Sequence, residues 1–206
     1  MSLKEKINAN PKLKNFIHWM LIAPGEARPR LWVKWFVNPF IHQRGKGSKV
    51  RRYTRMDVLP FNKFILGENS TVEDFSCVNN GVGDVFIGNN TLIGMGNVII
   101  GPVNIGNNVI FAQHIVASGL NHEYRDITTP IKDQKTITAT ITVEDDCWIA
   151  ANAVLTAGVT IGKHSVVAGG AVVTKSIPPY SVAAGNPAKV IKRFDEASGE
   201  WVSVKN

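Results

Sequence analysis

Residues 87–116 read IGNNTL-IGMGNV-IIGPVN-IGNNVI-FAQHIV, five consecutive units of six residues that each open on an apolar residue. Nine more such units lie on either side, three in residues 66–83 and six in residues 143–178. A six-residue period matches neither the period of a helix, about 3.6 residues, nor the simple alternation of a long half-buried strand. It indicates short strands separated by tight corners and stacked as the coils of a parallel β-helix.

The first position of all fourteen units is apolar, as expected for side chains that fill the inside of the coils. These residues are Leu66, Val72, Val78, Ile87, Ile93, Ile99, Ile105, Phe111, Val143, Ile149, Leu155, Ile161, Val167 and Val173. Glycine or alanine is frequent at the second position, where we expect corners that need a positive φ. The fifth position is mostly small or β-branched, as on an inner strand face, but Asn97 is an exception. If about three units make a coil, the fourteen units predict between four and five coils.

The length of 206 residues fits a single domain, and the sequence divides into three parts. We expect a helical and basic cap segment at residues 1–60, a β-helix domain at residues 61–188 with a loop at 117–142, and a tail at residues 189–206. Residues 1–55 hold 13 Lys or Arg and 2 Asp or Glu, a net charge of +11, whereas residues 56–206 hold 10 and 14, a net of −4. The basic character of the chain therefore belongs to its N-terminal segment.

The N-terminal segment is predicted to be helical over residues 3–22, divided at Pro11, and again over residues 31–37, before Pro39. The expected apolar contacts are Leu3, Ile7, Phe16, Met20 and Ile22. One interpretation is a cap or a subunit contact, because the open end of a solenoid exposes strand edges and core. Another is peripheral contact with an anionic membrane or a lipid-linked substrate, since tryptophans here alternate with Lys and Arg. Nucleic-acid binding is not expected, because no recognised module is present.

The cysteines and the apolar runs bear on the compartment of the protein. Cys77 and Cys147 lie 70 residues apart, and Cys147 falls at an inner position, so a buried free thiol is expected there. The N-terminus lacks the uninterrupted apolar core of a secretory signal, and no apolar run reaches about 18 residues. A cytoplasmic protein is therefore expected.

A 26-residue insertion interrupts the repeat after Val116 and carries the residues best suited to chemistry. Long loops inside regular repeats are usually functional or disordered, and this one places His, Glu, Tyr, Arg and Asp at the consecutive positions 122–126. His122 is the candidate general base, because an imidazole titrates near neutral pH. Glu123 or Asp126 is a candidate to orient the imidazole, and the spacing does not decide between them.

The remaining histidines are expected to be structural or exposed; they are His18, His42, His114 and His164. To bind zinc, His114 and His122 would need a third ligand from a distant part of the chain. No metal site is therefore expected.

The repeat, the loop and two further runs together resemble the hexapeptide-repeat acyltransferase superfamily. Those runs are residues 148–154 (WIAANAV) and residues 172–191 (VVTKSIPPYSVAAGNPAKVI). Within the loop, residues 121–126 (NHEYRD) followed by residues 129–131 (TPI) are similar to O-acetyltransferases of surface-polysaccharide biosynthesis and to maltose and galactoside acetyltransferases. The resemblance covers roughly residues 60–193.

The resemblance implies a fold, an assembly and a chemistry. The β-helix would be left-handed, an exception to the right-handed rule for crossovers, and three chains would pack with parallel axes. Active sites would lie between neighbouring prisms, with acetyl-CoA as co-substrate along the groove between them. His122 would take the proton from an acceptor hydroxyl as that hydroxyl attacks the thioester. A backbone N–H near Ala150 or Ala151 would meet the developing oxyanion.

The family pattern also implies a set of residues that bind the co-substrate. Small side chains let the pantetheine arm lie against the coil, and lysines near the end of the chain hold the nucleotide phosphates. The residues that match these roles are Ala151, Gly169, Thr174, Lys175, Lys189 and Lys192. Arg193 lies beside the last of them, and Trp148 matches a packing wall of the site.

The sequence therefore predicts an acetyl-CoA-dependent O-acetyltransferase that acts on a saccharide hydroxyl, in a small-molecule or lipid-linked precursor of a surface polysaccharide. The basic, aromatic N-terminal segment differs from the short helical start of the sugar acetyltransferases, which argues against a free maltose- or galactoside-like acceptor. Three alternatives remain. They are an antibiotic O-acetyltransferase, a non-catalytic β-helix scaffold that would not bind CoA, and a zinc-dependent β-helix like carbonic anhydrase.

Overall fold

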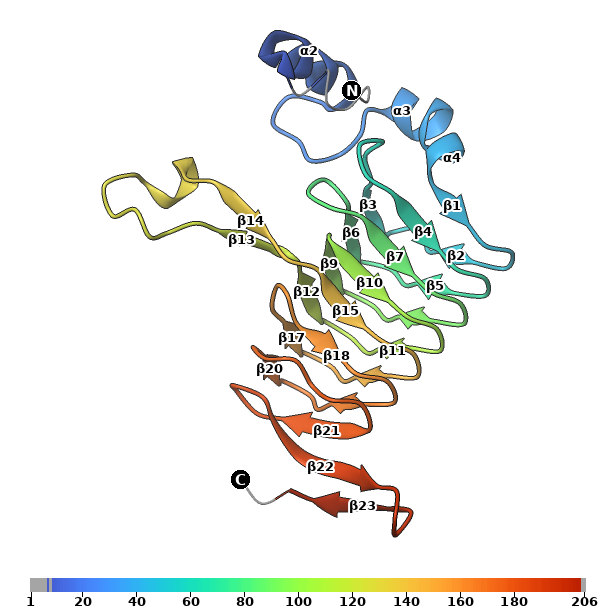
Figure 1. The fold of residues 1–206 in the computed structure, drawn as a ribbon. Helices are drawn as coiled ribbons and strands as arrows, with labels where there is room; N and C mark the ends of the chain where they lie inside the picture. The colour runs from blue at the N-terminus through green and yellow to red at the C-terminus, as the bar shows by residue number, and fades with distance from the viewer. Residues whose placement is uncertain (1–6, 8, 205–206) are drawn as a thin grey trace.

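The computed structural model describes residue 7 and residues 9–204, so Leu3 of the expected N-terminal contacts lies outside the described residues. The chain winds into a left-handed parallel β-helix, with short helices at the N-terminal end, a hairpin at the C-terminal end and one arm that projects sideways (Figure 1). The all-β fold class predicted from the repeat is thereby confirmed.

Three parallel sheets form the three faces of the prism, and each coil contributes one strand to each face (Figure 1). The first sheet contains β1 (Gln43–Arg44), β4 (Phe64–Leu66), β7 (Val85–Ile87), β10 (Val103–Ile105), β15 (Ile141–Val143) and β18 (Thr160–Ile161). The second contains β2 (Lys49–Val50), β5 (Thr71–Val72), β8 (Leu92–Ile93), β11 (Ile110–Phe111), β16 (Trp148–Ile149), β19 (Val166–Val167) and β21 (Ser181–Ala184). The third contains β3 (Arg55–Asp57), β6 (Cys77–Asn79), β9 (Val98–Ile100), β12 (Val116–Ser118), β17 (Val154–Leu155) and β20 (Val172–Val173).

The C-terminal tail continues the second sheet. β22 (Lys189–Asp195) pairs antiparallel with β21, and β23 (Glu200–Ser203) pairs antiparallel with β22. The segment expected as a tail is therefore a hairpin that extends the sheet beyond the last coil (Figure 1).

The first coil lies earlier in the chain than predicted. Its strands β1, β2 and β3 pair in parallel with β4, β5 and β6, in a register that places Val50 opposite Val72. Arg44 occupies the position of Leu66, so the apolar residue that marks a unit is missing there. The β-helix begins at residue 43 rather than 61, and the prediction of between four and five coils is too low, because the first and third sheets each contain six strands.

The insertion also leaves the coil later than the repeat pattern indicates. Ala117 is fully buried in β12 and fills the first position of a fifteenth unit. The coil resumes with β15, whose first residue, Ile141, is fully buried as well. The predicted loop at 117–142 therefore includes two residues of β12 and two of β15.

The apolar first positions form the core of the prism. All fourteen are buried, with at most 3% of any residue exposed, and they belong to one continuous apolar cluster. The fifth positions pack beside them. Cys147 is buried and free, as predicted, and burial raises the pKa of its thiol to about 11. Removing this apolar surface from water, at about 25 cal/mol per Å², is the main term that holds the coils together.

The glycines at the second position serve a different purpose from the one predicted. Gly88 does not adopt a positive φ, but a Cβ added to it would lie 2.5 Å from the backbone of Gly106 on the next coil. The left-handed conformation falls instead on the fourth position, at Asn69, Asn90 and Asn108, with φ between 52° and 55°. Asparagine tolerates that conformation better than other side chains with a Cβ. Glycine is thus needed for close stacking of the corners, and asparagine makes the turn.

Asn97, the polar exception among the inner positions, bridges neighbouring coils. Its Nδ2 donates to the carbonyl oxygens of Gly94 and Ala112, both at 2.8 Å, and its Oδ1 accepts from the Ile115 N–H at 2.6 Å. The side chain is fully buried, and both its amide groups are paired. It therefore satisfies the Ile115 N–H and the Ala112 carbonyl oxygen, which a small apolar residue would leave without partners.

Short helices cover the N-terminal end of the prism. They are α2 (Pro11–Leu21), α3 (Leu31–Phe36) and α4 (Asn38–Ile41). The predicted division at Pro11 is where α2 begins, because the missing N–H of proline costs nothing in a first turn. No helix in the described part of the chain is long and apolar enough to cross a membrane.

Three of the predicted contacts, Ile7, Met20 and Ile22, are partly buried. α2 buries Leu21 and α3 buries Val33, whereas Phe16, one of the expected contacts, is 56% exposed. Most of the aromatic surface of this segment consequently faces away from the prism.

Replacing Asn97 by leucine tests the bridging role. Asn97→Leu leaves the Ile115 N–H and the Ala112 carbonyl oxygen without partners, whereas the Gly94 carbonyl oxygen keeps its hydrogen bond from the Ser76 hydroxyl; a buried unsatisfied group costs about 1–3 kcal/mol. We expect the free energy of unfolding in urea to fall by at least about 2 kcal/mol. Asn104→Leu, at an exposed position of β10, is the matched control and should change stability little. Equal stabilities of the two variants would contradict the bridging role.

Candidate functional site

A two-stranded arm leaves the prism between β12 and β15 (Figure 1). Its strands β13 (Leu120–His122) and β14 (Thr136–Thr138) pair antiparallel, and the 3-10 helix η1 (Ile131–Asp133) lies in the turn at its tip. At the base, the Ala139 N–H donates to the Gly119 carbonyl oxygen at 2.9 Å. The chain therefore leaves and re-enters the coil at one point, and the arm is an ordered ribbon.

His122 lies at the end of β13, opposite Thr136, and is exposed. Its imidazole has no hydrogen-bond partner or ion-pair partner among the residues that the structure describes. A histidine held on an ordered ribbon and left unpaired by its own chain is free to exchange a proton with a bound molecule.

The two candidate orienting carboxylates are engaged elsewhere on the arm. Glu123 accepts hydrogen bonds from the backbone N–H groups of Tyr124 at 2.9 Å and Arg125 at 3.1 Å, and these bonds lower the pKa of its carboxyl. Asp126 accepts from the side chain and N–H of Thr128, at 2.6 and 2.8 Å, and from the Thr129 hydroxyl at 2.8 Å. These bonds, led by that of the Thr128 side chain, lower the pKa of Asp126 to about 2. Neither carboxylate hydrogen-bonds to His122 within this chain.

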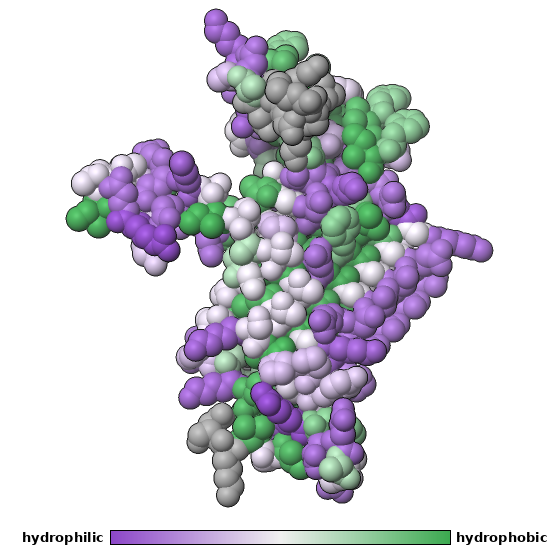
Figure 2. Space-filling view, in the orientation of Figure 1, coloured by the Kyte–Doolittle hydropathy of each residue, from purple (hydrophilic) through white to green (hydrophobic). Residues whose placement is uncertain are grey.

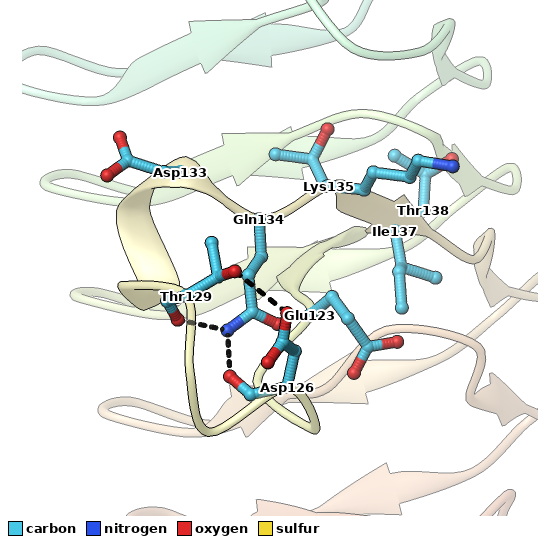
Figure 3. A pocket seen from close by; sticks show the side chains of 9 residues that line it. Glu123, Asp126, Thr129, Asp133, Gln134, Lys135, Ile137 and Thr138 are labelled. Atoms are coloured by element: carbon cyan, nitrogen blue, oxygen red, sulfur yellow. Dashed lines mark hydrogen bonds between the residues drawn. The ribbon is translucent and has the colours of Figure 1, made fainter.

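The tip of the arm is closed around Gln134 (Figure 3). The Gln134 Nε2 donates to the backbone carbonyls of Asp126 and Thr129, both at 2.7 Å. These bonds fold the tip over a shallow hollow of about 580 Å³. Its lining residues are Glu123, Asp126, Thr129, Asp133, Gln134, Lys135, Thr136, Ile137 and Thr138. His122 is not among them, so the hollow belongs to the architecture of the arm.

A second hollow, also of about 580 Å³, lies at the base of the arm. It is bordered by segments 60–63 and 82–84, by Ile41 and Pro102, and by Thr138 of β14. Its polar groups include the side chains of Asn62, Lys63 and Asp84, an amide, an ammonium and a carboxylate. Thr138 lies two residues along β14 from Thr136, the partner of His122, so this hollow and the histidine share one side of the prism.

The residues expected to bind CoA lie toward the C-terminal end of the prism. Ala151 and Gly169 stack on consecutive coils at the corner between the second and third sheets, where the Gly170 N–H donates to the Ala151 carbonyl oxygen at 2.9 Å. The other four are exposed, after β20 and on β22: Thr174, Lys175, Lys189 and Lys192. The structure thus brings the small residues together at one corner and the cations to the adjoining end.

The two candidate oxyanion donors are not equivalent. The Ala150 N–H donates to the Val167 carbonyl oxygen at 2.9 Å and is therefore occupied by the coil. The Ala151 N–H has no partner among the described residues, which leaves it as the candidate donor.

The outward faces of the second and third sheets carry a pattern that the sequence reasoning missed. From the third coil onward, the sixth position of the units there is apolar: Leu92, Val98, Ile110, Val116, Trp148, Val154, Val166 and Val172. Trp148 stands in this row between Ile110 and Val166, and about half of it is exposed. On the first sheet, Asn104, Thr142 and Thr160 take the corresponding positions in the later coils. In the later coils, two outward faces of the prism are therefore apolar and one is more polar.

Among the described residues, no group of three or more His, Cys, Asp or Glu side chains is placed to hold a metal ion. His114 lies at a coil corner, in the left-handed conformation, and not on the arm.

The repeat units match known families of proteins in two places. Residues 140–175 match the bacterial transferase hexapeptide family (six repeats), and residues 84–112 match the hexapeptide repeat of succinyl-transferase. Both matches are to hexapeptide-repeat families, so the chain carries the repeat of this superfamily. The resemblance noted in the sequence is thereby confirmed at the level of the superfamily.

Relatives of this hexapeptide-repeat chain include named acetyltransferases. It is 30% identical over 178 residues to a probable acetyltransferase of Mycobacterium tuberculosis, covering 85% of this chain and 56% of the relative. It is 35% identical over 140 residues to galactoside O-acetyltransferase of Escherichia coli, covering 64% of each protein. The chain thus spans 56% and 64% of the lengths of these two curated relatives.

Solved structures share the fold at lower identity. A variant of an N-acyltransferase from Bacillus cereus, in complex with dTDP-4-amino-4,6-dideoxyglucose and coenzyme A, matches with a TM-score of 0.66 at 17% identity, over 80% of this chain and 91% of that one. A maltose O-acetyltransferase from Clostridium difficile matches with a TM-score of 0.55 at 24% identity, over 89% and 84% of the two chains. At these identities the similarity establishes the left-handed β-helix and not the substrate.

Replacing Asp126 tests what holds the arm in shape. Asp126→Ala removes three hydrogen bonds to Thr128 and Thr129, so we expect the tip to open more often. Trypsin should then cleave after Arg125, Lys132 or Lys135 several-fold faster, while the global melting temperature stays nearly constant. Asp133→Ala is the control, because Asp133 pairs only with the adjacent Lys132. Equal cleavage rates in both variants would mean that Asp126 does not hold the tip.

Proposed function

We propose that this chain is an acetyl-CoA-dependent O-acetyltransferase that transfers an acetyl group to a hydroxyl of a saccharide, with His122 as the general base. The observation that carries the proposal is the exposed, unpaired imidazole held on an ordered arm. The relatives named as acetyltransferases, one of them a galactoside O-acetyltransferase, support the reaction class.

The reaction needs one proton acceptor and one oxyanion donor. His122 takes the proton of the acceptor hydroxyl as its oxygen attacks the thioester carbonyl carbon. The Ala151 N–H donates to the oxyanion that forms. When the intermediate collapses, the C–S bond breaks, and the imidazolium returns its proton to the sulfur. The products are the acetyl ester and CoA thiol. Holding hydroxyl and thioester together supplies much of the remaining acceleration.

The proposed site is completed by a neighbouring chain. The arm, whose strand β13 contains His122, projects away from its own prism (Figure 1). Ala151 and Gly169 lie instead at a coil corner. The apolar outward residues of the second and third sheets support packing of three chains with parallel axes, because two faces of each prism would then be covered. In that homotrimer the arm of one chain reaches the groove beside the next.

The co-substrate and acceptor occupy different parts of this groove. Ala151 and Gly169 leave room for the pantetheine arm, Thr174 lies alongside, and Lys175, Lys189 and Lys192 attract the nucleotide phosphates. The hollow at the base of the arm, with its amide, ammonium and carboxylate groups, suits a polyhydroxylated acceptor. A surface-polysaccharide precursor remains the proposed acceptor, and a cytoplasmic location remains a prediction.

An amine acceptor is the second candidate, because short stretches of the chain match N-acetyltransferases. One is the tetrahydropyridine-dicarboxylate N-acetyltransferase of Brevibacillus brevis, 49% identical over 65 residues. A screen that pairs each saccharide with its amino-sugar counterpart separates the two acceptor classes.

Calorimetry with acetyl-CoA tests co-substrate binding without knowledge of the acceptor. We expect saturable binding at about one site per chain, and ligand at about 100 times Kd should raise stability by about 2.7 kcal/mol. The double variant Lys189→Gln, Lys192→Gln should bind more weakly and with a smaller dependence on salt, because two cations near the phosphates are gone. A folded protein that binds no acetyl-CoA at millimolar concentration would favour the scaffold interpretation.

His122→Ala tests the general base. Turnover, measured as CoA thiol released with an acceptor found in the screen, should fall by about 10²–10⁴-fold, while acetyl-CoA affinity stays nearly unchanged. Glu123→Gln is the matched control: its amide oxygen still accepts from Tyr124 and Arg125, and turnover should stay close to that of the original protein. An unchanged rate in His122→Ala would remove this histidine from the mechanism.

A further inference from the structure

The N-terminal end of the prism exposes more large apolar side chains than any other part of the described chain. Figure 2 shows hydrophobic atoms gathered there over α3 and α4. We call this surface the N-terminal face; its apolar members are Leu31, Trp35, Phe36 and Phe40, exposed by 74%, 66%, 74% and 87%. Soluble proteins rarely leave such a group of residues uncovered, so the face marks an interaction surface.

The helices are fixed to the prism in a way that keeps these side chains outward. Val33 is the one buried residue of α3, and α4 has none. The Asn38 Nδ2 ties α4 to the first coils by donating to the Val58 carbonyl oxygen at 2.8 Å. A single inward anchor on a six-residue helix leaves its remaining apolar residues on the outside.

The N-terminal segment that carries these apolar residues is also rich in cations without ion-pair partners. Residues 9–55 hold 11 Lys or Arg and one acidic residue, Glu26. Some of the arginines are engaged, as Arg55 is with the buried Asp57 at 2.8 Å. Eight cations form no ion pair with any described residue: Lys12, Lys14, Arg30, Lys34, Arg44, Lys46, Lys49 and Arg52. Aromatic side chains beside free Lys and Arg are the combination that partitions into the headgroup region of an anionic bilayer.

We propose that the N-terminal face docks on the surface of an anionic phospholipid bilayer. The face ends the solenoid at one end of its axis (Figure 1). In the parallel-axis trimer of the proposed function, on which this step rests, three such faces point in the same direction and cannot cover one another. A flat bilayer contacts all three at once, and the three weak contacts then add their binding free energies.

Docking also fits the position of the arm. The arm leaves the fourth coil, three coils below the first, which corresponds to about 15 Å at about 4.8 Å per coil. A saccharide carried on a lipid headgroup can therefore reach His122 while the N-terminal face rests on the bilayer. The acceptor class that follows is a lipid-linked saccharide.

Co-sedimentation of the full chain with vesicles tests the proposal. We expect binding to vesicles of equal parts phosphatidylcholine and phosphatidylglycerol, weakening as salt rises, and little binding to phosphatidylcholine alone. The double variant Trp35→Ser, Phe36→Ser should lose at least tenfold in affinity. Ile127→Ser is the control: it removes an apolar side chain that is 96% exposed on the arm, and its binding should match that of the original protein.

Three outcomes would overturn the docking. One is absence of binding to the anionic vesicles. Another is that the Trp35, Phe36 variant binds as tightly as the original protein, because the binding would then come from charge attraction alone. The third is light scattering that shows a higher oligomer lost in the same variant, because a second copy would then cover the face. Acetyl-CoA calorimetry on each variant tests the proposed function separately. If acetyl-CoA still binds while vesicle binding is absent, the docking is wrong and the proposed function stands.

Discussion

The backbone hydrogen bonds between successive coils are the constraint on which the rest of this structure depends. The Gly67 N–H donates to the Ile87 carbonyl oxygen and the Gly88 N–H to that of Ile105, both at 2.8 Å. Since every coil is bonded to the one before and the one after, all coils must follow nearly the same path. Corners that stack this closely leave no room for a Cβ at Gly67 or Gly88. The six-residue period of the sequence therefore results from close backbone packing at the corners as well as from burial of apolar side chains.

The same constraint decides where the chain can depart from the repeat. Extra residues cannot be placed within a strand without breaking the ladder, so they leave at corners. Up to β20, the three longest segments between the strands of the prism, residues 58–63, 80–84 and 119–140, all lie at the corner between the third sheet and the first. That edge consequently carries the arm, on which His122 lies, and the hollow at the base of the arm, while the other two edges stay regular. Because the insertions all lie along this one edge of the prism, the regular coils hold the irregular segments of the candidate site next to one another.

The sequence was sufficient for most of the fold because the inner positions report on the core directly. It was insufficient where the first position holds no large apolar residue: Arg44 stands there in the first coil and the small Ala117 in the fifteenth unit. The outward apolar rows were in the sequence at the sixth position, but they gain meaning only once the sheets are known to be faces of a prism. For the site, His122 could be identified from the sequence, but its surroundings could not. The carboxylates of Glu123 and Asp126 accept hydrogen bonds from neighbouring residues of the arm, and neither bonds to the imidazole.

The positions of the proposed binding surfaces along the axis are consistent with a single direction of transfer. The N-terminal face precedes the first coil, the hollow at the base of the arm lies beside the second to fourth coils, and the arm leaves the fourth. Ala151 and Gly169 follow on the fifth and sixth coils, and Lys189 and Lys192 lie on the hairpin beyond. An acceptor entering from a bilayer and a co-substrate held by its phosphates at the opposite end would meet near the level of the arm. The cations proposed to attract lipid and those proposed to attract nucleotide lie at opposite ends of the prism, farther apart than the screening length of about 8 Å in physiological salt. In this proposal the N-terminal face can bind anionic lipid and the C-terminal hairpin can bind the nucleotide phosphates without interfering with each other.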